Sequence, residues 1–286
     1  MPTTVTPLRY PGGKSQLTPF VAELLRANGL SGGVYAEPYA GGAGLAWALL
    51  LSGQASEIWI NDIDQGIFSF WHSVLNNTEQ LCSRIEKTRI TMQTWHTQRE
   101  VMLSNTGSRL DIGFATLFLN RTNRSGIISG GVIGGKNQDG NYKLDCRFNR
   151  DELIAKIRRI GSYREVVKLT QIDARACIAK WGKELPKKGL MNIDPPYFAK
   201  GRDLYTNFYR PDDHKLVANV ISKLKCPWIL TYDDTPEICA LYSKFRIYRK
   251  ALAYSAQVKR QANELLVISP KINLSCESSE ELAQAA

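Results

Sequence analysis

Two short stretches decide the fold: VYAEPYAGGAG, from Val34 to Gly44, and EIWIND, from Glu57 to Asp62. Val34 to Glu37 is apolar enough for a buried strand, glycines follow it, and Leu45 to Leu51 has the composition of a helix. The second stretch predicts another strand, which ends at Asp62. Strand, glycine turn, helix, strand and acid form the opening unit of a doubly wound α/β sheet.

The same sheet resumes after a long gap. Later strands are predicted at Val166 to Thr170, Leu190 to Ile193 and Pro227 to Tyr232, with a helix from Asp212 to Leu224 and a final antiparallel pair at Arg246 to Ala253 and Glu264 to Ser269. We therefore expect a Rossmann-like, mostly parallel sheet built from residues 1–67 and 164–274. Residues 68–163, with helical patterns and a glycine-rich loop from Asn120 to Asp145, are predicted to form an inserted domain, and 275–286 a flexible tail.

Composition narrows the class of protein. The chain has 286 residues, 43% of them hydrophobic, which is enough for a sizeable core. Its net charge is +10, and residues 84–165 alone contain 15 Lys and Arg against 8 Asp and Glu. Such uneven basic charge favours a polyanionic partner, usually nucleic acid, over a merely solvated basic surface. No apolar run is long enough to span a membrane, so we expect a cytoplasmic protein.

A disulfide framework, a metal site and a phosphate loop are all disfavoured. The six cysteines are scattered without a C-x-x-C pair and the three histidines stand far apart, so neither a disulfide framework nor a metal site is predicted. The run YPGGKSQ, from Tyr10 to Gln16, contains Gly-Lys-Ser, but a phosphate loop needs a glycine five positions before Gly13 and Leu8 stands there. Nucleotide hydrolysis is therefore not expected.

The stretch NIDPPYF, from Asn192 to Phe198, carries the chemistry. It follows a buried strand, so Asp194 and its neighbours stand at the carboxyl edge of the sheet, where open α/β folds bind ligands. Two prolines stiffen the backbone and remove two donors, leaving carbonyl oxygens as acceptors. The motif suits a substrate that presents an amino group, with Tyr197 placed to stack on a planar ring.

The glycine turn and Asp62 form a second pattern. Glycines at the end of the first strand let the backbone approach a ligand, and an acid 18 residues after Gly44 is where such folds bind ribose hydroxyls. Together they predict a nucleoside-containing cofactor.

These motifs, in this order, resemble the Dam-type (D12 class) DNA adenine methyltransferases. The similarity runs from YPGGKSQL through EPYAGGAG, NDID and DPPY to the closing ANELLVIS, nearly the whole chain. The resemblance implies S-adenosylmethionine as the cofactor, double-stranded DNA as the substrate, and a recognition domain inserted into the sheet. It implies that Tyr10, Lys14, Glu37, Gly41, Gly42, Gly44, Asp62, Asp173 and Asp194 bind the cofactor, and that Asp194, Pro195, Pro196 and Tyr197 are catalytic.

The mechanism that follows is direct methylation of adenine N6 after the base is flipped out of the duplex. The Asp194 carboxylate and the Pro195 carbonyl would accept the two N6 hydrogens. Contacts to DNA are expected from the inserted domain, at Asn120, Arg121, Asn123, Arg124, Lys136 and Lys143. The loop does not match the hairpin of GATC-methylating members, so no target sequence is predicted.

Three alternatives stay open: methylation of RNA adenine, methylation of a protein glutamine, and a catalytically silent DNA-binding subunit of the same fold. Enzymes acting on glutamine usually show N-P-P-Y, and here the first residue is Asp194. A bacterial or phage-type protein associated with the nucleoid, with or without a restriction or defence partner, fits the resemblance. The sequence does not indicate an oligomeric state.

Overall fold

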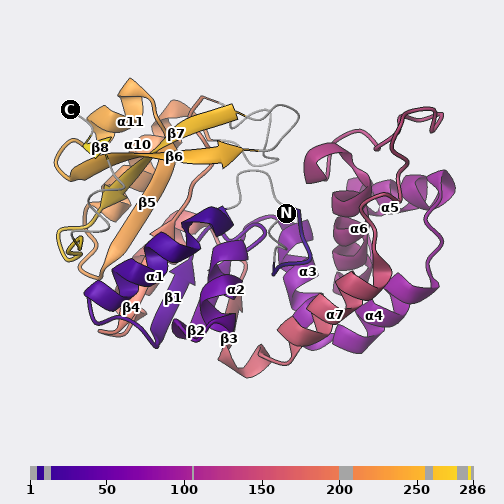
Figure 1. The fold of residues 1–286 in the computed structure, drawn as a ribbon, viewed down its shortest axis with the longest axis horizontal. Coiled ribbons are helices and arrows are strands. Elements are labelled where there is room, and N and C mark those ends of the chain that lie inside the picture. The colour runs from indigo at the N-terminus through magenta and orange to yellow at the C-terminus, as the bar shows by residue number, and fades with distance from the viewer. Residues whose placement is uncertain are drawn as a thin grey trace.

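The computed structural model describes residues 5–9, 14–104, 106–199, 209–254, 260–275 and 283–284. Its strands form one sheet in the order β3-β2-β1-β4-β5-β7-β6-β8 (Figure 1). The parallel strands are β1 (Gly33–Glu37), β2 (Ala55–Asn61), β3 (Val167–Thr170), β4 (Gly189–Ile193) and β5 (Trp228–Asp233). The antiparallel strands are β6 (Arg246–Tyr254), β7 (Arg260–Ile268) and β8 (Ala283–Gln284). The predicted fold class, a mostly parallel sheet with antiparallel pairing at its C-terminal end, is confirmed.

Helices cover both faces of the sheet because the strands are apolar on both sides. In β1, Tyr35 packs into one buried cluster, together with η1 (Lys14–Leu17), α1 (Thr18–Ala27) and α2 (Gly44–Leu51). Its neighbours Val34 and Ala36 point to the opposite face and pack into a second cluster. That cluster is completed by α8 (Ala174–Glu184), α10 (Pro211–Ile221) and α11 (Pro236–Leu241).

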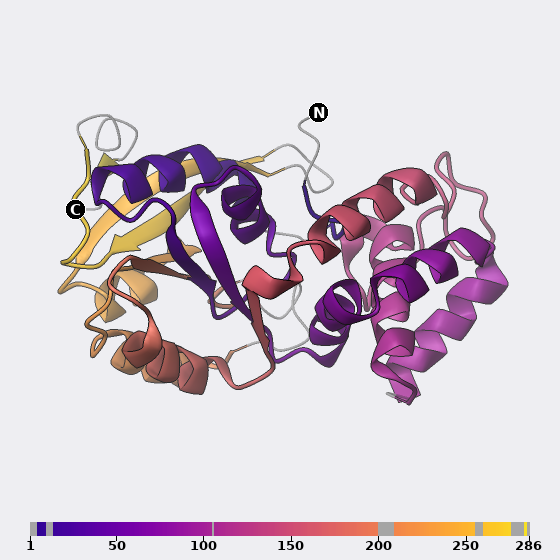
Figure 2. The same cartoon turned by 90° about the horizontal axis from the view of Figure 1, so that it is seen from below.

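The segment between β2 and β3 is a group of helices beside the sheet (Figure 2). It contains α3 (Gln65–Asn76), α4 (Thr78–Lys87), α5 (Met92–Ser104), α6 (Arg109–Thr122), η2 (Arg124–Gly126), α7 (Arg150–Gly161) and η3 (Arg164–Val166). Trp71 and Phe118 of these helices belong to the same buried cluster as Tyr35 of the sheet, so one continuous core joins the two parts. Asp64 caps α3 by accepting from the Ile67 N–H, which places the domain boundary predicted after residue 67 inside this helix.

Most of the predicted tail lies outside the described residues. Ala283–Gln284 pair with Tyr248 and Arg249 of β6, as a short strand at the edge of the sheet. Within the part of the chain that the structure describes, no helix is both long and apolar enough to cross a membrane.

Candidate active site at the carboxyl edge of the sheet

The DPPY motif follows β4, between β1 and β5 near the middle of the sheet. Oδ1 of Asp194 accepts a hydrogen bond from Thr231 Oγ1 at 2.8 Å and lies 2.9 Å from Lys14 Nζ. No other described residue hydrogen-bonds to this carboxylate, so Oδ2 remains available as an acceptor. One oxygen of Asp194 is thus held in place while the other can accept from a substrate.

Lys14 contacts Asp194, Tyr197 and Glu264, although it lies 183 residues before Tyr197 in the chain. Its ammonium is buried, donates to the Tyr197 hydroxyl at 3.0 Å, and lies 3.5 Å from Glu264 Oε1. The Tyr197 hydroxyl in turn donates to the same Glu264 oxygen. Lys14 therefore connects the N-terminal segment to the DPPY motif and to β7.

Asp233, at the end of β5, holds the backbone that follows DPPY. Its two oxygens accept from the N–H groups of Phe198 and Ala199, each at 2.8 Å. Pro195 and Pro196 have no N–H, so the backbone of the diproline itself cannot donate to the sheet. The N–H groups directly after Tyr197 make these bonds instead. Asp233 and Thr231 therefore position the motif from the neighbouring strand.

The glycine turn and Asp62 are in direct contact. Gly41 has a φ of 47°, and its N–H donates to Asp62 Oδ2 at 2.8 Å, while Asp62 Oδ1 accepts from the Asp64 N–H. Burial, reinforced by the nearby Asp64 carboxylate, raises the pKa of Asp62 to about 7. Gly44 allows two helices to pack closely. A Cβ at this position would lie 2.3 Å from Ser15 Oγ, so the glycine lets η1 approach α2.

Glu37 ends β1 and is buried next to the DPPY strand. The register that pairs Ala36 with Met191 brings Glu37 beside Asn192. Burial, followed by repulsion from Asp194, raises the pKa of Glu37 to about 8. The Asn192 side-chain oxygen is buried and accepts no hydrogen bond from the residues that the structure describes. This edge of the sheet is therefore rich in acceptors that a ligand can use.

Three further residues were predicted to bind the cofactor: Asp173, Tyr10 and Gly42. Asp173 is exposed and caps α8, accepting from the N–H groups of Arg175 and Ala176, and it forms an ion pair with Arg175 at 3.2 Å. Tyr10 lies outside the described residues. Gly42 is buried in the glycine turn between Gly41 and Gly44.

Four residues that build this site were not predicted from the sequence: Asn61, Thr231, Asp233 and Glu264. Asn61 is fully buried and ties the strand ends together, donating to the carbonyls of Pro38 and Ile172 and accepting from the Thr170 hydroxyl. A signal was present in the sequence, since Asn61, Thr231 and Glu264 are polar residues that stand next to apolar runs of their strands.

The residues predicted to contact DNA fall into two groups. Arg124, Lys136 and Lys143 are exposed, and Lys143 donates to the Gln138 carbonyl at 2.6 Å. Asn120 and Asn123 are fully buried, and both use their side-chain amides within the chain. In this conformation the two asparagines position the loop after α6.

The bonds of the asparagines define that loop. The Asn120 side chain accepts from the Arg9 N–H and donates to the Arg9 and Gly126 carbonyls. Asn123 accepts from the Trp95 indole at 2.7 Å and donates to the carbonyls of Ile127 and Ile128.

Arg121 lies beside them with 8% of its surface exposed, and its Nε is buried without a partner among the described residues. Burial, together with the nearby Arg9, lowers the pKa of Arg121 to about 10. Arg9 itself has a buried Nη1 without a described partner. Two positive charges therefore lie close together beside this loop.

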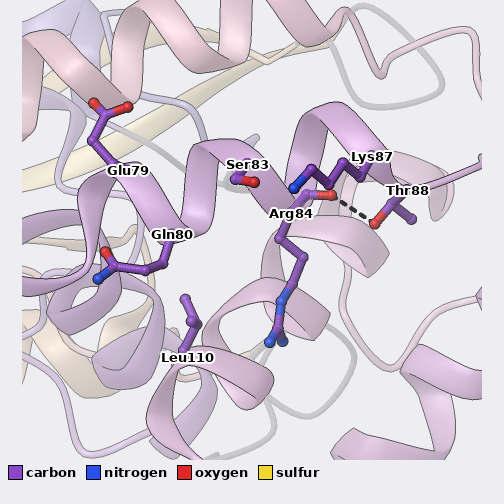
Figure 3. A pocket seen from close by; sticks show the side chains of 7 residues that line it. All are labelled: Glu79, Gln80, Ser83, Arg84, Lys87, Thr88 and Leu110. Atoms are coloured by element: carbon purple, nitrogen blue, oxygen red, sulfur yellow. Dashed lines mark hydrogen bonds between the residues drawn. The ribbon is translucent and has the colours of Figure 1, made fainter.

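A separate surface cavity of about 690 Å³ lies on the helical group (Figure 3). It is lined by Glu79, Gln80, Ser83, Arg84, Lys87, Thr88 and Leu110. These residues belong to α4, the turn after it and α6, and α4 lies apart from the strands of the sheet (Figure 1). The cavity therefore does not belong to the candidate active site.

A known protein family matches most of the chain. The family model described as D12 class N6 adenine-specific DNA methyltransferase matches residues 10–256. A solved structure with some similarity is the rRNA methyltransferase aviRa from Streptomyces viridochromogenes, with 12% sequence identity and a TM-score of 0.37 over 92% of this chain and 87% of that chain. No curated protein matches the sequence.

Proposed function

Because the chain belongs to the D12 class N6 adenine-specific DNA methyltransferase family, we propose that it methylates adenine N6 at a specific site in double-stranded DNA, after flipping the base into the DPPY pocket. Family membership makes it an S-adenosylmethionine-dependent DNA adenine-N6 methyltransferase. Site specificity, the duplex substrate and base flipping are the proposal. The observation that carries it is the anchored Asp194 carboxylate, whose Oδ1 is held by Lys14 and Thr231 and whose Oδ2 accepts no hydrogen bond from the residues that the structure describes.

The residues at the strand ends fit the cofactor. S-adenosylmethionine carries ribose hydroxyls and an ammonium group, which are hydrogen-bond donors. Asp62, Glu37 and the Asn192 oxygen, which has no partner among the described residues, are acceptors that line the edge from β2 to β4. We assign Asp62 to the ribose, as this type of fold does, and Glu37 with Asn192 to the remaining donors. When bound, the cofactor supplies an electrophilic methyl group on its sulfonium.

Asp194 prepares the nucleophile. The exocyclic amine of adenine is a poor nucleophile because its lone pair is delocalised into the ring. Acceptance of one N6 hydrogen by Asp194 Oδ2 and of the other by the Pro195 carbonyl would localise that lone pair. A hydrogen bond to a charged group contributes about 1.5–3 kcal/mol, and Lys14 and Thr231 hold the carboxylate in the orientation in which this contribution is realised.

The helical group is proposed to hold the DNA. Arg124, Lys136 and Lys143 offer exposed charges, and Arg121 and Arg9 offer buried donors that a phosphate would satisfy. Flipping costs a few kcal/mol, which stacking on an aromatic ring offsets in part. We assign that stacking to Tyr197, whose hydroxyl is held by Lys14 and Glu264.

Substitution of Asp194 tests the proposal. Wild-type chain, Asp194→Asn and Asp194→Ala are expressed in a methylation-free bacterial host, and modified adenines are mapped across the genome. We expect N6-methyladenine at one sequence motif in the wild type. Loss of a charged acceptor at the reacting amine should lower the rate by at least about a hundredfold in both variants. Glu237→Ala, on the exposed face of α11, serves as the control that retains activity.

Three results would contradict the proposal. Methyl transfer only to RNA or to a protein glutamine would assign a different substrate. Binding of duplex DNA without binding of S-adenosylmethionine would favour a silent DNA-binding subunit. Methylation that persists in Asp194→Ala would remove this carboxylate from the reaction.

A further inference from the structure

Glu264 is a buried carboxylate for which the methyl transfer described above assigns no chemical step. It lies on β7, the antiparallel strand next to β5, where it pairs in register with Asp233. Only 3% of its surface is exposed. A carboxyl group so deep in a sheet is costly unless it has partners, and its partners are two residues of the active site.

Those partners converge on one oxygen. Glu264 Oε1 accepts the Tyr197 hydroxyl and lies 3.5 Å from the Lys14 ammonium, which itself donates to Tyr197 and contacts Asp194 Oδ1. The other oxygen, Oε2, accepts no hydrogen bond from the residues that the structure describes. Tyr197 and Lys14 are therefore fixed relative to each other by a single acceptor that comes from a third element.

We infer that Glu264 is a positioning residue for methyl transfer, which holds the Tyr197 ring and the Lys14 ammonium in the arrangement that presents Asp194 to the substrate. The inference rests on the proposed function. Without this acceptor, the Tyr197 hydroxyl loses the carboxylate to which it donates, and the Lys14 ammonium loses its contact with Glu264 while its contact with Asp194 remains. Lys14 would then draw more of the negative charge of Asp194 away from the adenine amine.

The acceptor oxygen and the charge of Glu264 can be removed separately by substitution. An acceptor oxygen at Oε1 is present in Glu whether or not the group is protonated, and it is also present in Gln. Burial raises the pKa of Glu264, while the Lys14 ammonium and the Tyr197 hydroxyl oppose that effect. A Gln substitution therefore keeps the acceptor, and an Ala substitution removes it.

The test is a double-mutant cycle on the full-length chain with Tyr197→Phe, Glu264→Ala and the combined variant, alongside Glu264→Gln. Methyl transfer is measured as kcat and as KM for DNA, and S-adenosylmethionine binding is measured by calorimetry. Because Glu264→Ala removes a hydrogen bond to a charged group, its kcat should be about ten- to a hundredfold lower than that of the wild type. KM for DNA, which depends on phosphate contacts elsewhere, should change by less than about threefold. Glu264→Gln should recover most of the loss in kcat.

Coupling distinguishes positioning from a general role in the fold. If Glu264 acts through Tyr197, the losses in the combined variant are smaller than the product of the single losses. S-adenosylmethionine binding should weaken in Glu264→Ala, because Lys14 loses a partner, and should recover in Glu264→Gln. Exposed Glu237→Ala is the matched control, which should leave kcat and the binding constant unchanged.

The inference is overturned if the effects of Tyr197→Phe and Glu264→Ala multiply independently. It is also overturned if Glu264→Ala only lowers the melting temperature, with normal kcat and cofactor binding per folded molecule. Failure of the proposed function looks different, because the wild-type chain would then transfer no methyl group to DNA adenine. In that case the inference falls together with the proposed function, whereas a wild-type chain that methylates DNA adenine leaves the mutant cycle to decide the role of Glu264.

Discussion

At the scale of single residues, Glu37 makes stability depend on pH. Burial raises its pKa to about 8, whereas in the unfolded chain the group titrates near 4.5. Between these values the folded chain retains a proton that the unfolded chain releases. The free energy of unfolding should therefore fall as pH rises from about 4.5 to 8, by up to about 1.4 kcal/mol per pH unit from this group.

Glu37→Gln isolates this effect, because Gln resembles the protonated acid in shape and cannot ionise. We expect the variant and the wild type to have similar stability near the low end of that range, and the variant to be the more stable of the two at its upper end. Urea unfolding at several pH values measures the difference. Curves that stay parallel across the range would show that Glu37 does not hold a proton in the folded chain.

At the scale of elements, the contact between the N-terminal segment and η2 depends on Gly126. Its φ is 77°, and a Cβ there would lie 2.1 Å from the Arg9 carbonyl oxygen, so alanine would be strained and would also clash with backbone. Gly126→Ala should lower the free energy of unfolding by about 1–3 kcal/mol. Because Arg9 lies five residues before Lys14, we also expect weaker cofactor binding.

Gly131 provides the matched control in the same loop. No atom lies within 4 Å of a Cβ built on it, and its φ is not positive. Gly131→Ala should therefore change the stability by less than about 1 kcal/mol. Equal losses in both variants, measured by denaturant unfolding, would mean that the close approach to Arg9 does not matter.

At the scale of the whole molecule, basic charge is concentrated in the helical group, and this distribution predicts which surface binds DNA. Each phosphate contact contributes about one unit to the slope of log affinity against log salt concentration. Arg124→Ala, after α6, should lower that slope by about one. The measurement is DNA binding by fluorescence anisotropy at several salt concentrations.

Lys223→Ala is the control of equal charge. Lys223 is exposed and follows α10 at the amino-terminal side of β5, the opposite end of the strands from Asp194. The slope should be unchanged in this variant. A reduction in Lys223→Ala that matches the one in Arg124→Ala would show that net charge, rather than a defined surface, controls binding.

The sequence by itself determined the fold and the position of the candidate site in it. Buried strands, glycines and acids recur at spacings that backbone geometry dictates, so the stretches around Asp62 and Asp194 could be placed at the carboxyl edge of one sheet. The predicted strands agree with the observed ones to within a few residues, because apolar periodicity is a local property of the chain.

Only the tertiary structure decided which polar side chains turn inward and which meet. Asn120 and Asn123 look like loop residues that bind DNA, yet both are buried and hold Arg9 and Trp95. Glu264 reaches Tyr197 from 67 residues away, through an antiparallel strand whose register local sequence does not specify. Contacts of this kind depend on how strands and helices pack against each other, and packing is a property of the whole chain.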